Sequence, residues 1–292
     1  MDSIAPNQEH YHFAFIEDPQ CNIQYILSRQ YLIRYVPDCI CPERGGGASV
    51  QNLEMDIAAK VHYSFLPEGY ENDFLDVAVQ ARPHNRIGGD YCSILPLDEK
   101  NLIVCMCDAV GHGIASALYA ARVNSFVLTH FLRHGDPCNL IYALNEFLCR
   151  HLSDTGIYTT FCSIFINYET REMEIAGAAH PPVLYYNKEV GDSEMLSSET
   201  TLLGLHHPLP LACSSNRRTL HSGDKVVLYT DGLIEAGWEK RMSSGIEHLK
   251  EFTRSNYHLS STKFNDVLLA ETIKRSDGQL NDDILVLTVT IK

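Results

Sequence analysis

Apolar and polar positions follow two different spacings along this chain of 292 residues, and the spacings predict its elements. Short apolar or alternating runs predict strands, whereas apolar residues at intervals of three and four predict helices. Strands are expected at residues 71–80, 90–96, 102–108, 159–167, 173–178, 183–186, 226–229 and 284–291, and helices at 51–65, 114–133, 137–152, 245–255 and 264–275. Runs of strands with helices set between them predict an α+β layered domain.

The first 49 residues differ in pattern from the rest. Tyr11, Phe13 and Phe15 alternate with other residues, and residues 31–36 form a second strand-like run, so we expect a small β-rich appendage. Residues 42–49 contain three consecutive glycines and predict a linker. The predicted organisation is an appendage with its linker at 1–49, a linker or switch helix at 50–68 and a larger domain at 69–292.

The predicted helix at 51–65 has one apolar face. Leu53, Ile57, Val61 and Phe65 recur every four residues, which places them on the same side of a helix. This face either joins the domain to a regulatory element or a second copy of the chain, or packs on its own domain. The spacing alone does not distinguish these alternatives.

The charge balance limits the partners that the protein can have. The sequence has 23 Lys and Arg against 37 Asp and Glu, a formal net charge of -14, which disfavours nucleic acid and anionic membranes. No uncharged apolar run approaches the roughly 18 residues needed to cross a bilayer. The first ten residues have neither a basic segment nor an apolar stretch, so we expect no secretory signal and a cytoplasmic location.

Ten cysteines raise the question of disulfides or zinc sites. In a reducing cytoplasm we expect neither. Cys39 and Cys41, like Cys105 and Cys107, are separated by one residue instead of the two usual at zinc sites. Cys105 and Cys107 are expected on one face of a strand as small apolar core residues. A redox role for Cys39 and Cys41 stays open.

Four aspartates in separate stretches carry the candidate chemistry. Asp90 follows two glycines, Asp108 and Asp231 each follow a predicted strand, and Asp282 precedes the last one. Carboxylate oxygens gathered at strand ends are the ligands that hard divalent cations prefer. Few Lys or Arg stand near these positions, which favours a metal over ion pairs as the compensating charge. The set predicts a metal-dependent phosphoryl hydrolase.

Five segments in a fixed order carry a family resemblance. They are RIGGDY at 86–91, DAVGHGIASAL at 108–118, AHPP at 179–182, LYTDGLIEA at 228–236 and DDI at 282–284. In these segments the chain, from about Gln51 to its end, resembles the SpoIIE/RsbU branch of the metal-dependent protein phosphatases (PPM, protein phosphatase 2C-like). The resemblance implies an αββα sandwich, in which two central antiparallel β-sheets are flanked by helices.

The resemblance also implies how the aspartates are used. Asp108 would bridge two Mn²⁺ or Mg²⁺ ions, and the backbone carbonyl of Ala109 would bind one of them. Asp231 and Asp282 would complete the other ion, while Asp90 would hold the site directly or through water. Two such ions activate a water that attacks phosphorus in line with the seryl leaving oxygen, so no covalent enzyme intermediate is needed.

The chain departs from the wider superfamily near the bridging aspartate. Val110 stands where other members have a histidine that acts as general acid, and His112 lies four residues after the aspartate. For His112 a role at the helix start is weighed equally with one in binding phosphate or the leaving group. His180 precedes two prolines, which favours a turn-stabilising role. Arg82 and Arg86 are candidates for holding the phosphoprotein, although surface arginines are the commoner case.

The expected function is therefore a cytoplasmic phosphatase acting on phosphoserine or phosphothreonine in proteins. The resemblance implies a phosphorylated STAS-domain anti-sigma factor antagonist as substrate in bacterial partner switching, with an upstream sensor or activator and a homodimer through the linker helix as further partners. One alternative is a phosphatase-like binding module that sequesters a partner without turnover, and the complete set of aspartates disfavours it. A hydrolase of small phosphate esters or nucleotides is disfavoured because no glycine-rich phosphate loop is found.

Overall fold

The structure is a computed structural model that describes residues 14–18, 23–28, 31–32, 50–111, 113–131, 136–237 and 242–292. The chain forms two compact units, Met1–Ser49 and Val50–Lys292. In the first unit β1 (Ala14–Asp18), β2 (Ile23–Ser28) and β3 (Tyr31–Leu32) form an antiparallel sheet in that order. Tyr11, Phe13 and the predicted linker at 42–49 lie outside the described residues. The boundary at residue 68 stays a prediction.

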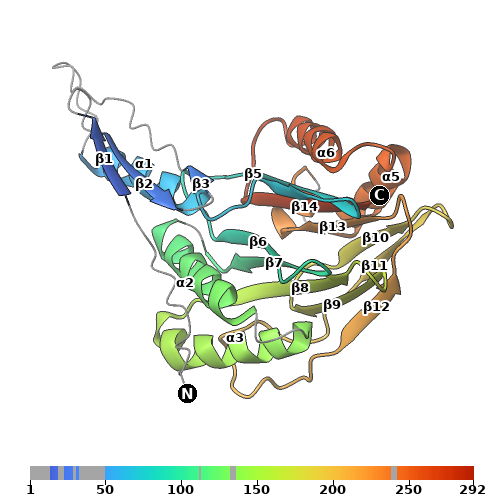
Figure 1. Ribbon diagram of the computed structural model, residues 1–292, viewed down its shortest axis with the longest axis horizontal. Helices are drawn as coiled ribbons and strands as arrows, with labels where there is room; N and C mark the ends of the chain where they lie inside the picture. The colour runs from blue at the N-terminus through green and yellow to red at the C-terminus, as the bar shows by residue number, and fades with distance from the viewer. Residues whose placement is uncertain are drawn as a thin grey trace, which may run out of the picture. The chain divides into compact units, whose positions relative to one another are not determined.

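Two antiparallel sheets form the centre of the second unit (Figure 1). A six-stranded sheet has the order β11-β10-β13-β14-β5-β4, and a five-stranded sheet has the order β12-β9-β8-β7-β6. The strands of the six-stranded sheet are β4 (Gly69–Glu71), β5 (Leu75–Arg82), β10 (Val183–Asn187), β11 (Asp192–Leu196), β13 (Lys225–Tyr229) and β14 (Ile284–Ile291). Those of the five-stranded sheet are β6 (Asp90–Pro96), β7 (Asn101–Ala109), β8 (Thr159–Asn167), β9 (Glu172–Ala178) and β12 (Ser215–Thr219).

Helices cover the outer faces of both sheets. The five-stranded sheet is covered by α2 (Ile114–His130) and α3 (Pro137–Leu152), and the six-stranded sheet by α4 (Asp231–Glu235), α5 (Met242–Asn256) and α6 (Ser261–Arg275). A further helix, α1 (Val50–Tyr63), contacts α2. Figure 1 shows α2 and α3 on one side of the molecule and α5 and α6 on the other. The start of α3 is fixed locally, because Asp136 accepts a hydrogen bond from the backbone N–H of Asn139 at 3.1 Å and Pro137 begins the helix.

Buried side chains form three layers that hold the sandwich together. Successive side chains of a strand point to opposite faces. In β7, Val104 and Met106 therefore lie in the layer between the sheets, whereas Cys105 and Cys107 lie in the layer under α2 and α3. A third layer, which includes Val227, lies between the six-stranded sheet and α4 to α6. The predicted αββα sandwich is confirmed, as is the core placement of Cys105 and Cys107.

One strand prediction is wrong, and two strands were missed. The single strand expected at 71–80 is broken into β4 and β5 by a turn, in which Asn72 Oδ1 accepts the backbone N–H groups of Phe74 and Leu75, each at 2.9 Å. The edge strands β11 and β12 were not predicted. The sequence of β12, Ser-Asn-Arg-Arg-Thr, has no apolar residue, so this strand exists through its pairing with β9.

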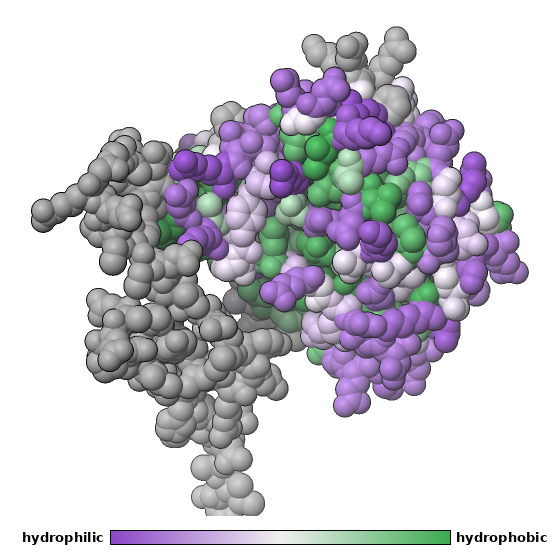
Figure 2. Space-filling model, turned by 90° about the horizontal axis from the view of Figure 1, so that it is seen from above, coloured by the Kyte–Doolittle hydropathy of each residue, from purple (hydrophilic) through white to green (hydrophobic). Residues whose placement is uncertain are grey.

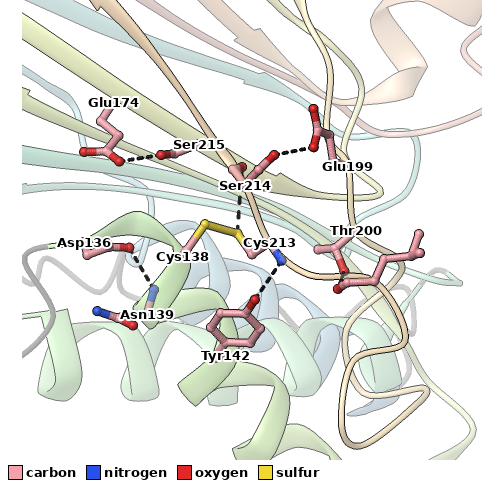
Figure 3. The surroundings of a disulfide bond; sticks show 11 residues. Asp136, Cys138, Asn139, Tyr142, Glu174, Glu199, Thr200, Cys213, Ser214 and Ser215 are labelled. Atoms are coloured by element: carbon pink, nitrogen blue, oxygen red, sulfur yellow. Dashed lines mark hydrogen bonds between the residues drawn. A yellow bond between two sulfur atoms is a disulfide. The ribbon is translucent and has the colours of Figure 1, made fainter.

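A disulfide joins α3 to the loop between β11 and β12 (Figure 3). It links Cys138 with Cys213, so the expectation of no disulfide is wrong for this pair. The two cysteines are 75 residues apart, and no short spacing pattern marks them. The backbone N–H of Cys213 also donates to the Tyr142 hydroxyl at 2.8 Å. The free cysteines among the described residues are Cys92, Cys105, Cys107, Cys149 and Cys162, whereas Cys39 and Cys41 lie outside them.

The surface combines polar borders with apolar areas. Figure 2 shows hydrophilic residues around the visible face of the second unit and apolar residues gathered between them. On α1, Ile57 is 51% exposed and Val61 is 53% exposed, whereas His62 is buried. Whether the apolar face of α1 contacts its own domain, a regulatory element or a second copy of the chain stays open. In the described part of the chain, no helix combines the length and the apolar character that a membrane span needs.

Candidate functional site

Asp90 and Asp108 meet across two neighbouring strands. The register of β6 and β7 pairs these residues directly. Asp90 is 8% exposed, and Asp108 is half-buried. A Cβ atom on Gly89 would lie only 2.8 Å from the carbonyl oxygen of Ala109, so the glycine allows the two backbones to approach closely. The structure thus brings together both carboxylates and the Ala109 carbonyl.

The six-stranded sheet supplies the other two aspartates. Asp231 begins α4 directly after Thr230, which follows the end of β13 at Tyr229, and Asp282 lies just before the start of β14. Because β13 and β14 are antiparallel neighbours, the end of one lies beside the start of the other. The backbone N–H of Thr230 donates to the Leu285 carbonyl at 3.0 Å, which fixes this arrangement. All four predicted aspartates therefore converge on one end of the sandwich.

Burial and mutual repulsion raise the pKa values of these carboxyls. Burial and then the charge of Asp108 raise the pKa of Asp90 well above its usual range. The pKa of Asp108 rises to about 7, through burial and then Asp231 and Asp282. Burial and then Asp282 raise the pKa of Asp231 to about 6. The charged groups that shift these three pKa values are all acidic, so no cationic side chain among them offsets the repulsion.

The cluster fits hard divalent cations in its chemistry. Its donors are carboxylate oxygens, and Asp231 Oδ1 is buried without a hydrogen-bond partner among the described residues. A dication would supply that partner and reverse the repulsion among the carboxylates. In the part of the chain that is described, no three His, Cys, Asp or Glu side chains already form a complete metal site.

Three further residues lie at the site, and the sequence analysis missed them. Thr230 donates its hydroxyl to Asp90 Oδ2 at 2.8 Å. Asp283 Oδ1 accepts the backbone N–H of His84 at 2.8 Å. His62, near the end of α1, is buried, and burial lowers its pKa while the charge of Asp283 opposes the shift. Adjacency to Asp282 was a sequence signal for Asp283, but no motif pointed to a side-chain role for Thr230 or His62.

Val110, His112 and Arg86 are further residues that the sequence analysis considered for the site. Val110 is 51% exposed and has no ionisable group, so it cannot act as general acid. His112 lies outside the described residues. Arg86 Nη1 lies 3.2 Å from Asp56 Oδ1 on α1, and both side chains are more than half exposed. Such an exposed ion pair is the surface arrangement that the sequence favoured for this arginine.

His180 belongs to the framework behind Asp108. It is buried, and its Nδ1 lies 3.1 Å from Thr160 Oγ1. The same hydroxyl accepts the backbone N–H of Asp108 at 3.2 Å. The Ser198 hydroxyl donates to the His180 carbonyl at 3.0 Å. These contacts agree with a structural role for His180 at the end of β9.

Comparisons with known proteins identify the family to which the chain belongs. The model of the SpoIIE family, described as Stage II sporulation protein E, matches residues 98–292, which is more than half of the chain. The phosphoserine phosphatase RsbU of Bacillus subtilis is 22% identical over 241 residues, a match that covers 82% of this chain and 70% of RsbU. Asp108, Asp231 and Asp282 lie within the matched family segment, and Asp90 precedes it.

Solved structures agree with the fold. The SiaA-PP2C domain of Pseudomonas aeruginosa superposes with a TM-score of 0.71 at 17% identity, covering 83% of this chain and 97% of that domain. RsbX, solved in complex with magnesium, superposes with a TM-score of 0.56 at 18% identity, covering 77% of this chain and 98% of RsbX. These identities are low, so the likeness establishes the fold alone. With the family match and a shared architecture, the chain belongs to the SpoIIE family of PP2C-type phosphatases.

Proposed function

We propose that this protein is a Mn²⁺- or Mg²⁺-dependent phosphatase of phosphoserine and phosphothreonine in proteins. The observation that carries the proposal is the convergence of Asp90, Asp108, Asp231 and Asp282 from both sheets. Asp90 and Asp108 lie on the five-stranded sheet, whereas Asp231 and Asp282 lie beside strands of the six-stranded sheet. The acidic residues repel one another. A fold that gathers unpaired carboxylates in this way bears a cost in stability unless a cation binds there.

The chain's own residues would divide the work at the site. The four carboxylates and the Ala109 carbonyl would hold two divalent ions, with Asp108 between them. When bound, such ions activate the attacking water and neutralise the phosphoryl oxygens. Gly88 and Gly89 keep side chains away from the loop before Asp90, because a Cβ atom on Gly88 would lie 1.9 Å from Asp283 Oδ2. Val110 cannot protonate the departing seryl oxygen, so solvent water is the donor that we propose.

The substrate and partners follow from the family. We propose a phosphorylated STAS-domain anti-sigma factor antagonist as substrate, because the similar protein RsbU is a phosphoserine phosphatase and the motif resemblance implies partner switching. The apolar face of α1, with Ile57 and Val61 half exposed, is proposed as the contact to a second copy or to an upstream sensor or activator. We propose that the protein acts in the cytoplasm.

The test is metal-dependent release of phosphate from a phosphoserine STAS-domain protein. The unmodified chain should release phosphate with Mn²⁺ and stop when a chelator is added. Asp231→Asn should lower the rate roughly 100-fold or more, because it removes a charge that the ions require. Asp266→Asn, at an exposed position on α6, is the matched control and should keep the wild-type rate. Tight binding of the phosphoprotein with no release at any metal concentration would favour the binding module instead.

A further inference from the structure

Thr230 occupies a helix-capping position without capping the helix. It is fully buried at the junction of β13 and α4, with the extended backbone typical of an N-cap residue. A threonine at this position ordinarily accepts a backbone N–H from the first turn of the helix. Here the side chain makes no such bond. Its hydroxyl is used by other partners.

Those partners fix the direction of the hydroxyl proton. The backbone N–H of Leu285 donates to Thr230 Oγ1 at 2.9 Å, so one lone pair is taken by β14. The single proton of the hydroxyl then has two acceptors in reach: Asp90 Oδ2 at 2.8 Å and the Asp283 carbonyl at 3.5 Å. The shorter contact to a carboxylate is the stronger hydrogen bond. Thr230 therefore donates to Asp90.

This single hydroxyl connects the two sheets at the site. Asp90 begins β6 of the five-stranded sheet, whereas Thr230 and Leu285 belong to the β13 and β14 side of the six-stranded sheet. The surrounding backbone is closely packed, since a Cβ atom on Gly232 would lie 2.1 Å from the Asp283 carbonyl oxygen. The position of Thr230 is therefore set by its neighbours, and the hydrogen bond transmits that position to the Asp90 side chain.

We infer that Thr230 is a positioning residue that holds Asp90 Oδ2 and leaves Asp90 Oδ1 directed to a divalent cation. The inference rests on the proposed function only in taking Asp90 as a carboxylate of the metal site. Residues that orient a metal ligand typically change metal affinity 10–100-fold when they are replaced. Replacing Thr230 should lower the affinity for the cation, and it should lower turnover only because less cation is bound.

The experiment compares Thr230→Val, Thr230→Ala and Thr230→Ser in the full chain. Valine keeps the shape and removes the hydroxyl, alanine also removes the methyl group, and serine keeps the hydroxyl. Mn²⁺ affinity is measured by calorimetry, and the melting temperature is measured with a chelator present. We expect the valine and alanine variants to bind Mn²⁺ roughly 10–100-fold more weakly, and the serine variant to stay within about 3-fold of wild type.

Thr253→Val is the matched control. Thr253 is also fully buried, but its hydroxyl donates to the Leu249 carbonyl within α5. This variant should lower the melting temperature as much as Thr230→Val while leaving Mn²⁺ affinity unchanged. Wild-type affinity in a folded Thr230→Val protein would overturn the inference, as would an equal loss in Thr230→Ser. Loss of folding in both the valine and alanine variants, with Thr230→Ser folded, would make the hydroxyl structural and also overturn it.

The outcome is independent of the phosphatase assay. If the wild-type chain binds Mn²⁺ but hydrolyses no phosphoprotein, the proposed function fails while the affinity series still decides the role of Thr230. If the wild-type chain hydrolyses phosphoprotein and Thr230→Val binds Mn²⁺ normally, the proposed function holds and this inference fails.

Discussion

The buried imidazole of His180 should make the free energy of unfolding depend on pH. Burial lowers the pKa of His180 from 6.5 to about 3, so between these values the unfolded chain binds a proton that the folded chain does not. The free energy of unfolding must then fall as the pH drops below about 6.5, by about 2 kcal/mol at pH 5. His180→Gln should lose about 2 kcal/mol less than wild type between pH 7 and pH 5. Urea denaturation at both pH values, with a chelator present, measures this difference.

The control for this prediction is Thr253→Val. Thr253 is buried but has no ionisable group, so its replacement should lower the free energy of unfolding equally at both pH values. Identical losses in wild type and His180→Gln would mean that the imidazole is hydrated or protonated in the folded protein.

Single residues also differ in whether the sequence reveals their role. The four aspartates were predicted because carboxylates at strand ends have a distinctive chemistry, whereas the bond from Thr230 to Asp90 depends on contact between two sheets.

At the scale of elements, the apolar pattern predicted the strands that pack on both faces and missed those held by pairing. The bounds of β6, β8 and β14 match the predicted runs, because most of their residues are buried. In contrast, β11 and β12 are edge strands with polar, partly exposed sequences. Their existence depends on hydrogen bonds to β10 and β9, which no local pattern encodes.

The disulfide between α3 and the β11–β12 loop should raise the melting temperature of the chain. It closes a loop of 75 residues, and a cross-link of this span restricts the unfolded chain by roughly 2–4 kcal/mol. Reduction should therefore lower the melting temperature of the wild-type chain by several degrees. The double variant Cys138→Ser with Cys213→Ser should melt at the lower temperature and show no response to reductant. Labelling of Cys138 and Cys213 by a thiol reagent in the denatured, unreduced chain would show that the bond is absent in solution.

At the scale of the whole molecule, the acidic site is part of a chain with a formal net charge of -14. Added salt screens such charge generally, whereas a bound dication acts at one place. Any stabilisation by Mn²⁺ must therefore be compared with that of a monovalent salt at equal ionic strength. The local repulsion among Asp90, Asp108 and Asp231 predicts that the specific effect is the larger one.

Mn²⁺ at about 100 times its dissociation constant should stabilise the folded chain by about 2.7 kcal/mol, because the unfolded chain lacks the assembled carboxylates. Thermal unfolding of the wild-type chain should shift upward by several degrees with Mn²⁺ and by less with NaCl of equal ionic strength. In Asp231→Asn the Mn²⁺ shift should shrink to the size of the NaCl shift, since the site has lost a carboxylate while the net charge has barely changed. Equal shifts from Mn²⁺ and NaCl in the wild-type chain would mean that the converging aspartates do not form a cation site.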